Sequence, residues 1–202
     1  MEEVLSKIPT YSEELGLDLD HKEDRFKWFI ASVLFAKRIS SSIAKKTFMK
    51  FMEEDLTTPQ KIIGAGWDRL VEVLDSGGYV RYDFSTATNL LEIAEKLIRE
   101  YSGDIDKIHE EALDPQDLEK RLLEFKGVGP VAVNIFLREL RGIWSKADPR
   151  VSPKAFEVAH KLGLSEVKKY ETKLVKIYLE YCKRKRCHEC PFRKYCKVSK
   201  SD

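Results

Sequence analysis

Two helical patterns meet at the segment Leu122-Leu123-Glu124-Phe125-Lys126-Gly127-Val128-Gly129-Pro130-Val131-Ala132. The two glycines permit a tight turn and leave room for a ligand beside the main chain. Pro130 suits the first turn of the second helix, where no N–H donor is needed. We expect Val128 to form an apolar plug between the two helices. The first N–H groups of the second helix have no partner inside it, so its start is a natural phosphate site.

This arrangement is a helix-hairpin-helix motif, which contacts the DNA backbone without selecting a sequence. Five residues of the hairpin are therefore candidates for DNA binding: Lys126, Gly127, Val128, Gly129 and Val131. The alternative is a glycine-capped turn that joins two packed helices and binds nothing, because short motifs of this kind also occur without a ligand.

Helical periodicity extends over most of the remaining chain. Apolar residues recur every three or four positions around residues 26–34 and 90–98, and this spacing is typical of amphipathic helices. Further helices are expected at about 40–54, 59–64, 67–75, 115–125, 130–140, 153–162 and 167–181. No alternating pattern between hairpin turns predicts a strand. The sequence therefore predicts an all-α fold.

Composition excludes several classes of protein. Of the 202 residues, 43% are hydrophobic and 35% are charged, and the formal net charge is +2. These values are typical of a folded protein and exclude a disordered chain, and no apolar stretch is long enough to span a membrane. The N-terminus lacks the layout of a secretory signal. We expect a cytoplasmic protein associated with the nucleoid, and its few Asn and Gln residues are typical of thermophiles.

Positive charge is concentrated at the C-terminal end. Residues 182–202 carry eight basic and two acidic side chains, a local charge of +6, which leaves −4 for the other 181 residues. We expect Lys183, Arg184, Lys185 and Arg186 to face the phosphates of DNA. The alternative is a solvated tail whose charge only aids solubility.

All four cysteines lie in this tail, in the order Cys182-x4-Cys187-x2-Cys190-x5-Cys196. In a cytoplasmic protein, four closely spaced thiols favour a metal site over disulfides. Zinc is one candidate metal, because it takes four thiolate ligands in structural sites. His188 is an alternative ligand for one of the four positions.

A single aspartate follows the hairpin in the segment Ser145-Lys146-Ala147-Asp148-Pro149-Arg150-Val151-Ser152-Pro153, and another helical pattern begins after it. On its own, an aspartate before a proline is a helix cap or a turn residue. A hairpin, a helix and then such an aspartate resemble the helix-hairpin-helix (HhH-GPD) DNA glycosylases of the endonuclease III superfamily. The resemblance extends from about residue 26 to residue 196.

The resemblance implies a two-lobed helical enzyme that removes a damaged or mispaired base from duplex DNA. Residues 23–134 would form a helical barrel that ends with the hairpin, and residues 1–22 with 135–202 would form the second domain. Asp148 would be the catalytic carboxylate that faces the flipped-out nucleotide, where it stabilises positive charge on the sugar and orients a water. A monomer is expected, with the DNA bound between the lobes.

The resemblance also implies a [4Fe–4S] cluster in the loop 182–196, held by Cys182, Cys187, Cys190 and Cys196. The family spacing is x6, x2 and x5, so the last two intervals match and the first is two residues shorter here. Zinc remains the alternative.

One departure from the family bears on the reaction. Members that also cut the DNA strand use a lysine two residues after the second hairpin glycine, as a nucleophile that forms a Schiff base. Val131 stands at that position, which implies a monofunctional glycosylase that uses water. Two alternatives stay open: a glycosylase with abasic-site lyase activity that uses Lys126 or Lys146 instead, and a non-catalytic lesion-binding protein.

The N-terminal half contributes four further candidates. Lys37 and Arg38 occupy the segment that, in the family, fills the gap left by the flipped base. Tyr79 and Tyr82 flank a turn that resembles the family's second DNA-facing turn, where an aromatic ring can stack on a base. A solvated helix end and simple packing are the alternatives. Alkylated purines, uracil or thymine opposite guanine, and oxidised bases all remain candidate substrates.

Overall fold

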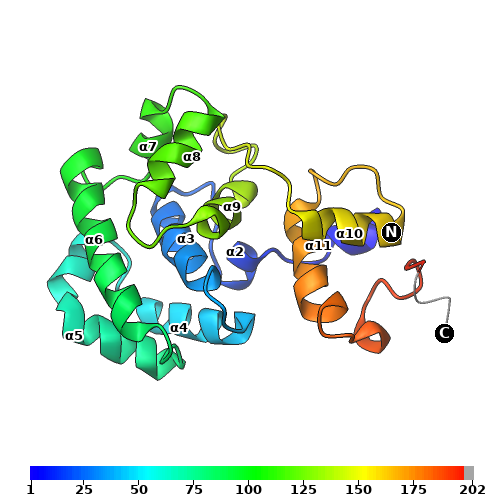
Figure 1. Ribbon diagram of the computed structural model, residues 1–202, viewed down its shortest axis with the longest axis horizontal. Coiled ribbons are helices and arrows are strands. Elements are labelled where there is room, and N and C mark those ends of the chain that lie inside the picture. The colour runs from blue at the N-terminus through cyan, green and yellow to red at the C-terminus, as the bar shows by residue number, and fades with distance from the viewer. Residues whose placement is uncertain (198–202) are drawn as a thin grey trace. The chain divides into compact units, whose positions relative to one another are not determined.

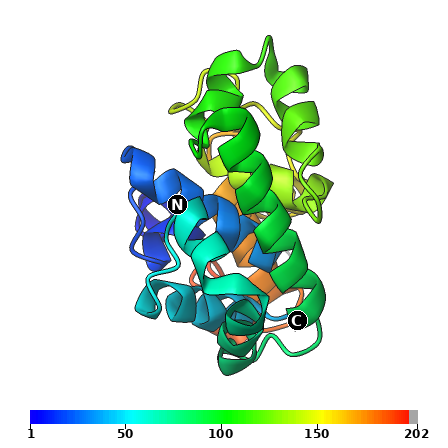
Figure 2. The same cartoon turned by 90° about the vertical axis from the view of Figure 1, so that its left-hand side faces the viewer.

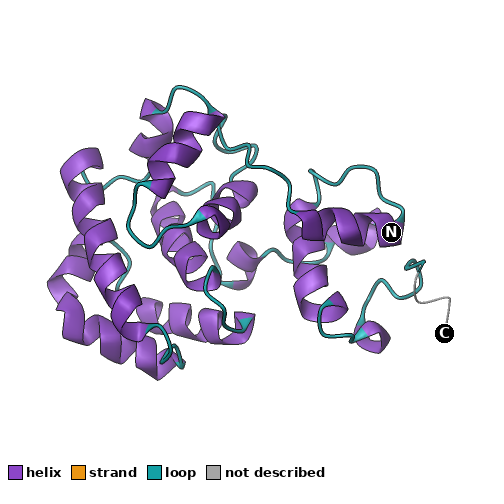
Figure 3. Cartoon of the chain, viewed as in Figure 1, coloured by secondary structure: helices purple, strands orange, loops and turns teal. Residues whose placement is uncertain are grey.

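The computed structural model describes residues 1–197, and every regular element in this part of the chain is helical (Figure 3). The predicted all-α fold is therefore confirmed. None of the helices in the described part is long and apolar enough to cross a membrane. The chain divides into two compact units, one of residues 15–149 and the other of residues 1–14 with 150–202.

The unit of residues 15–149 contains seven labelled helices (Figure 1). They are α3 (Lys22–Phe35), α4 (Ser41–Glu53), α5 (Pro59–Gly77), α6 (Asp83–Tyr101), α7 (Asp106–Glu111), α8 (Pro115–Leu123) and α9 (Pro130–Glu139). Side chains just before three of these helices accept hydrogen bonds from the first turn, namely Ser40, Thr58 and Asp114. Such caps satisfy N–H groups that the helix itself leaves unpaired.

Helix α3 lies at the centre of this unit and packs against α4 and α9 (Figure 1). The Phe29 ring meets Phe136 of α9 edge-on, with 5.0 Å between centroids. The Trp28 Nε1–H donates to the Phe136 carbonyl oxygen at 3.3 Å. Both α3 side chains are fully buried, so they fix α9, and with it one arm of the hairpin, on the core.

Helices α5 and α6 form the other side of the unit, and α6 is the long green helix in Figure 2. The expected break at residues 64–66 is present, because α5 leaves helical geometry at Gly66, with φ 74° and ψ 173°. At its other end, α5 approaches α4 closely. A Cβ atom on Gly77 would lie 2.5 Å from Thr47 Cα, so only glycine permits this packing.

The second unit has its own core, formed by α1 (Glu2–Ser6), α2 (Tyr11–Glu14), α10 (Pro153–Leu162), α11 (Glu171–Ile177), the π-helical turn η1 (Tyr178–Cys182) and the 3-10 turn η2 (Cys187–Glu189). Leu5, Val158, Leu174 and Phe192 are buried together. Lys176, which is 4% exposed, donates to Pro9 O at 2.7 Å and pairs with Glu14 at 2.5 Å. The buried ammonium therefore ties the N-terminal segment to α11.

One expectation about the helices needs correction. The helix expected over 167–181 begins only at Glu171 and changes to π geometry at Tyr178, and the short helices α1, α2 and α7 were not expected. The two compact units divide at residues 14/15 and 149/150, whereas the resemblance implies domain boundaries at 22/23 and 134/135.

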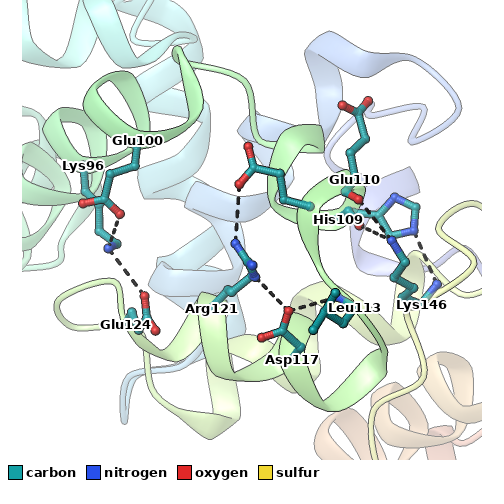
Figure 4. A network of polar contacts seen from close by, with 10 residues as sticks. Lys96, Glu100, His109, Glu110, Leu113, Asp117, Arg121, Glu124 and Lys146 are labelled. Carbon is teal, nitrogen blue, oxygen red and sulfur yellow. Dashed lines mark hydrogen bonds and ion pairs between the residues drawn. The ribbon is translucent and has the colours of Figure 1, made fainter.

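Contacts within residues 140–149 explain the second boundary. The Trp144 ring stacks on His109 of α7 at 5.0 Å and meets Phe136 edge-on at 5.4 Å. Lys146 Nζ donates to the carbonyl oxygens of His109 and Glu110 at 2.7 and 3.3 Å (Figure 4). These contacts of Trp144 and Lys146 hold residues 140–149 against α7 and α9, and so keep them in the unit of residues 15–149.

The position of His109 beside Trp144 and Lys146 predicts that the free energy of unfolding depends on pH. Burial, and then the charge of Lys146, lower the pKa of His109 below its ordinary value of 6.5. The unfolded chain therefore takes up a proton first as the pH falls, so the free energy of unfolding should decrease below about pH 6.5 and level off below the folded-state pKa.

Urea denaturation at pH values from about 7.5 to about 5 measures this effect, because the interval spans the ordinary histidine pKa. A His109→Gln variant lacks the titrating ring, and its stability should vary less over the same interval. Equal pH dependence of the two proteins would contradict the prediction.

Candidate functional site

The hairpin joins α8 to α9 as the sequence predicts. Helix α8 ends at Leu123, and α9 begins at Pro130 with Gly129 as its N-cap. Phe125 and Val128 are 1% and 5% exposed, so Val128 is the apolar plug that we expected. Because its side chain is buried, Val128 offers only its backbone to a ligand.

The two hairpin glycines have different roles. Gly127 has φ +76°, and a Cβ atom there would lie 2.9 Å from Asn89 Cβ and closer still to the Asn89 amide. Gly129 has an ordinary φ of −104°, and no atom lies within 4 Å of a Cβ added to it. Glycine at 127 is therefore a requirement of the fold, whereas glycine at 129 leaves open space at the start of α9.

The open space at Gly129 lies where α9 has unpaired donors. The first N–H groups of a helix have no acceptor within it, and the helix dipole places partial positive charge there. Val131, one residue into this turn, is 59% exposed. Main-chain groups here can thus be reached by an anion such as a phosphate.

Helix α6 supports the hairpin from one side. Asn89 lies under Gly127, and Glu92 Oε1 accepts from Lys126 Nζ at 2.7 Å. One turn further along, Lys96 Nζ pairs with Glu124 at 3.7 Å (Figure 4). These α6 residues lie three or four positions apart, so a single helix face holds the hairpin.

The turn that precedes α6 lies two helical turns from Asn89, and its aromatic residues differ from expectation. Tyr79 is 1% exposed, and its hydroxyl donates to Leu34 O at 3.0 Å; burial raises the pKa of this hydroxyl. The prediction that Tyr79 stacks on a base is therefore wrong, because no face of the ring is open. Tyr82 is half-buried, and the Arg81 guanidinium lies 5.4 Å from its ring centroid.

Tyr79 instead joins two loops. Its bond to Leu34 reaches the last turn of α3, and the loop with Lys37 and Arg38 follows directly. Arg38 is exposed and Lys37 is half-buried. The structure thus links this loop, the turn before α6 and the hairpin through Tyr79 and α6.

Asp148 lies in the irregular segment after α9, in the same unit as the hairpin. Its side chain is 47% exposed, and Oδ1 lies 3.4 Å from Arg141 Nε. The N-cap of α10 is Ser152, so Asp148 is not a helix cap. Of the two alternatives for this residue, the helix cap is therefore excluded, and a turn residue is left.

A second carboxylate lies near Asp148. Burial, and then the negative charge of Asp148, raise the pKa of Glu119 on α8. Neither Glu119 nor Arg141 could be found from the sequence, because each is brought to Asp148 by tertiary packing and belongs to no motif.

The two alternative lysine nucleophiles are both engaged elsewhere. Lys146 Nζ donates to two backbone carbonyls of α7 (Figure 4). Lys126 Nζ pairs with Glu92 on α6.

The four cysteines lie in the second unit, around η1 and η2. Burial, together with the charges of the other three thiols, raises the pKa of Cys182, and Lys161 opposes this. Burial also raises the pKa of Cys190, opposed by a hydrogen bond from the Phe192 N–H and aided by Cys196 and Cys187. Within residues 1–197, no three Cys, His, Asp or Glu side chains are arranged around a single metal ion.

The cysteine loop is held to the second unit by Phe192 and Lys197, and several of its basic residues are exposed. Phe192 is fully buried, and the Lys197 N–H donates to Lys161 O at 2.9 Å. Lys183, Arg184 and Lys185 are exposed, whereas Arg186 pairs with Glu189. Lys200 and Asp202, which contribute to the charge of the tail, lie outside the described residues.

No family model matches the sequence, and no curated protein matches it significantly. Two solved structures resemble the fold. One is a trapped endonuclease III–DNA covalent intermediate, an estranged-adenine complex, with a TM-score of 0.53 and 20% identity over 85% of this chain and 83% of that chain. The other is a thermostable thymine-DNA glycosylase, with a TM-score of 0.53 and 16% identity over 92% and 89%. The resemblance to helix-hairpin-helix glycosylases is thus confirmed for the fold.

The two glycines predict a separation of stability from DNA binding. Gly127→Ala should lower the free energy of unfolding by about 2 kcal/mol, because it demands a left-handed alanine and displaces Asn89. Gly129→Ala should cost less than about 1 kcal/mol but weaken binding of a duplex, because the new methyl group occupies the open space at α9.

Urea denaturation and fluorescence anisotropy with a labelled duplex measure the two effects. Each variant serves as the control for the other. A Gly129→Ala protein that binds duplex DNA like the wild type would contradict the role of the α9 N-terminus.

Proposed function

We propose that this chain is a DNA N-glycosylase that hydrolyses the bond between a flipped-out, damaged or mispaired base and its deoxyribose in duplex DNA. The observation that carries the proposal is the open start of α9 at Gly129, in the same compact unit as the half-exposed carboxylate of Asp148. The shared fold with an endonuclease III and a thymine-DNA glycosylase supports it.

The hairpin would bind the DNA backbone through main-chain N–H groups at Gly129 and the first turn of α9. Lys37 and Arg38 lie in the loop after α3 and would fill the gap left by the flipped base. Tyr82, half-buried beside Arg81, remains a candidate for contact with a base. The exposed Lys183, Arg184 and Lys185 would add phosphate contacts from the second unit.

Asp148 would act where positive charge develops. As the bond from C1′ to the base nitrogen breaks, the sugar becomes cationic, and a nearby carboxylate stabilises it. A water that Asp148 orients then forms a bond to C1′. One proton of that water leaves with the base, and the sugar retains a hydroxyl group as an abasic site.

Hydrolysis without strand cleavage is the form of the reaction that we propose. Val131 has no amine to form a Schiff base, and Lys126 and Lys146 are engaged with Glu92 and with backbone carbonyls. A bifunctional glycosylase remains the second candidate, because the endonuclease III structure that this fold resembles is a covalent intermediate with DNA.

We also propose that Cys182, Cys187, Cys190 and Cys196 hold a [4Fe–4S] cluster. The support is chemical: four cysteines lie within one loop of 15 residues, and thiolates are the ligands that iron–sulfur clusters take. When bound, the cluster would cross-link the loop and fix the exposed lysines and arginine beside it. Zinc fits the same four thiols and is the alternative.

Release of free base tests the proposed function. The substrates are duplexes with uracil or thymine opposite guanine, an alkylated purine or an oxidised base. The wild type should release at least one base, and Asp148→Asn should slow release about 100-fold or more, since one charged group at a developing charge commonly supplies that much.

Asp68→Asn, at an exposed aspartate on α5, is the matched control and should retain full activity. Base release by Asp148→Asn at the wild-type rate would refute the assignment. Borohydride added during the reaction should trap no protein–DNA adduct, and an adduct would establish the bifunctional alternative.

Optical absorption tests the cofactor. The purified protein should be brown, with visible absorption and with iron and sulfide in equal amounts, whereas a colourless protein that contains zinc would exclude the cluster. Cys196→Ser should lose the colour. His188→Ala should keep it, because His188 is exposed and pairs with Glu189.

A further inference from the structure

Asp148 is held by one side chain that the sequence motifs do not include. Arg141 follows α9 and lies 3.4 Å from Asp148 Oδ1 through its Nε. Its Nη2 donates to the carbonyl oxygen of Pro149. One guanidinium therefore forms an ion pair with the carboxylate of Asp148, in which Nε donates no hydrogen bond, and a hydrogen bond to the backbone of the next residue.

Arg141 differs from the exposed basic residues of the chain because its side chain is largely buried. Its side chain is only 14% exposed, whereas that of Asp148 is 47% exposed. A guanidinium covered to this extent and bonded to its own chain is poorly placed to contact a phosphate. A guanidinium is always charged and has several donors, so it can pair electrostatically with a carboxylate while another of its N–H groups donates to a carbonyl.

The positive charge of Arg141 also offsets the negative charge of Glu119 at Asp148. This α8 carboxylate is close enough to Asp148 for the two negative charges to interact. Like charges repel, and a cation beside one of two interacting carboxylates offsets the repulsion. Asp148 thus interacts with a like charge on α8 and with an opposite charge after α9.

We propose that Arg141 is a positioning residue for base release, which fixes the Asp148 carboxylate and offsets the negative charge of Glu119. The inference rests on the proposed function, since it assigns Arg141 a role through Asp148. Arg141 touches neither the DNA nor the reacting sugar in this role.

Single-turnover kinetics on the duplex that the wild type cleaves best test the inference. Arg141→Met should lower the rate of base release about 10- to 100-fold, which is the range expected when a catalytic group loses its orientation. The dissociation constant for the duplex should change less than about twofold, because phosphate contacts, and not Arg141, dominate affinity.

Arg121→Met is the matched control. It removes one arginine from the same unit and breaks ion pairs with Asp117 and Glu111 on α8 and α7 (Figure 4). Its ion pairs are with α7 and α8 and not with Asp148, so base release should proceed at the wild-type rate. A thermal melt of each variant shows whether a lost rate is a folding defect.

Two rescues distinguish positioning from a general structural role. Adding Glu119→Gln to Arg141→Met should recover part of the lost rate, because the charge that Arg141 offsets is then absent. Guanidinium ion, at concentrations far below those that denature, should partly restore an Arg141→Ala variant, whereas sodium chloride at equal ionic strength should not.

The outcomes separate this inference from the proposed function. A wild-type rate for Arg141→Met, with Asp148→Asn inactive, overturns the inference alone. Equal losses of rate and melting temperature in Arg141→Met and Arg121→Met, without rescue, also overturn it. If the wild type releases no base from any duplex, the proposed function fails and the inference fails with it.

Discussion

The burial of Phe125 is the contact on which the hairpin depends. Its ring meets Phe29 of α3 edge-on at 5.8 Å, stacks on Tyr101 of α6 at 6.2 Å, and has Lys96 Nζ 5.5 Å from its centroid. One side chain in the turn thus reaches two helices that are far apart in sequence. Because the ring is fixed, the next four residues have little freedom, and the glycines are held in one orientation on the surface.

The hairpin shows how far the sequence was informative. The Gly-Val-Gly turn, the start of α9 at Pro130 and the buried Val128 follow from local geometry, which is encoded by neighbouring residues. Asn89 could not be predicted, because its contact with Gly127 arises only when α6 packs against the turn. Local rules thus predict the shape of the motif, and tertiary contacts decide which of its glycines is indispensable.

Tyr79 and Asp148 also show that sequence patterns do not predict tertiary contacts. An aromatic residue at a turn can face solvent or the core, and sequence alone does not say which; the bond from Tyr79 to Leu34 places it in the core. Only the order of hairpin, helix and aspartate suggested a role for Asp148 other than a helix cap, and the structure shows that Ser152 is the N-cap of α10. Its partners Arg141 and Glu119 belong to no pattern, because charges that meet across loops have no fixed spacing in the chain.

The charge of the unit with the hairpin constrains how it can bind DNA. Residues 15–149 contain 20 basic and 24 acidic side chains, so the unit has a formal charge of −4. A net charge of this sign gives no overall attraction to a duplex at long range. Main-chain N–H groups at the start of a helix can bind a phosphate without a formal charge. They are therefore the kind of contact that an acidic unit can use, while the exposed cations beside the cysteines would supply the attraction that depends on salt.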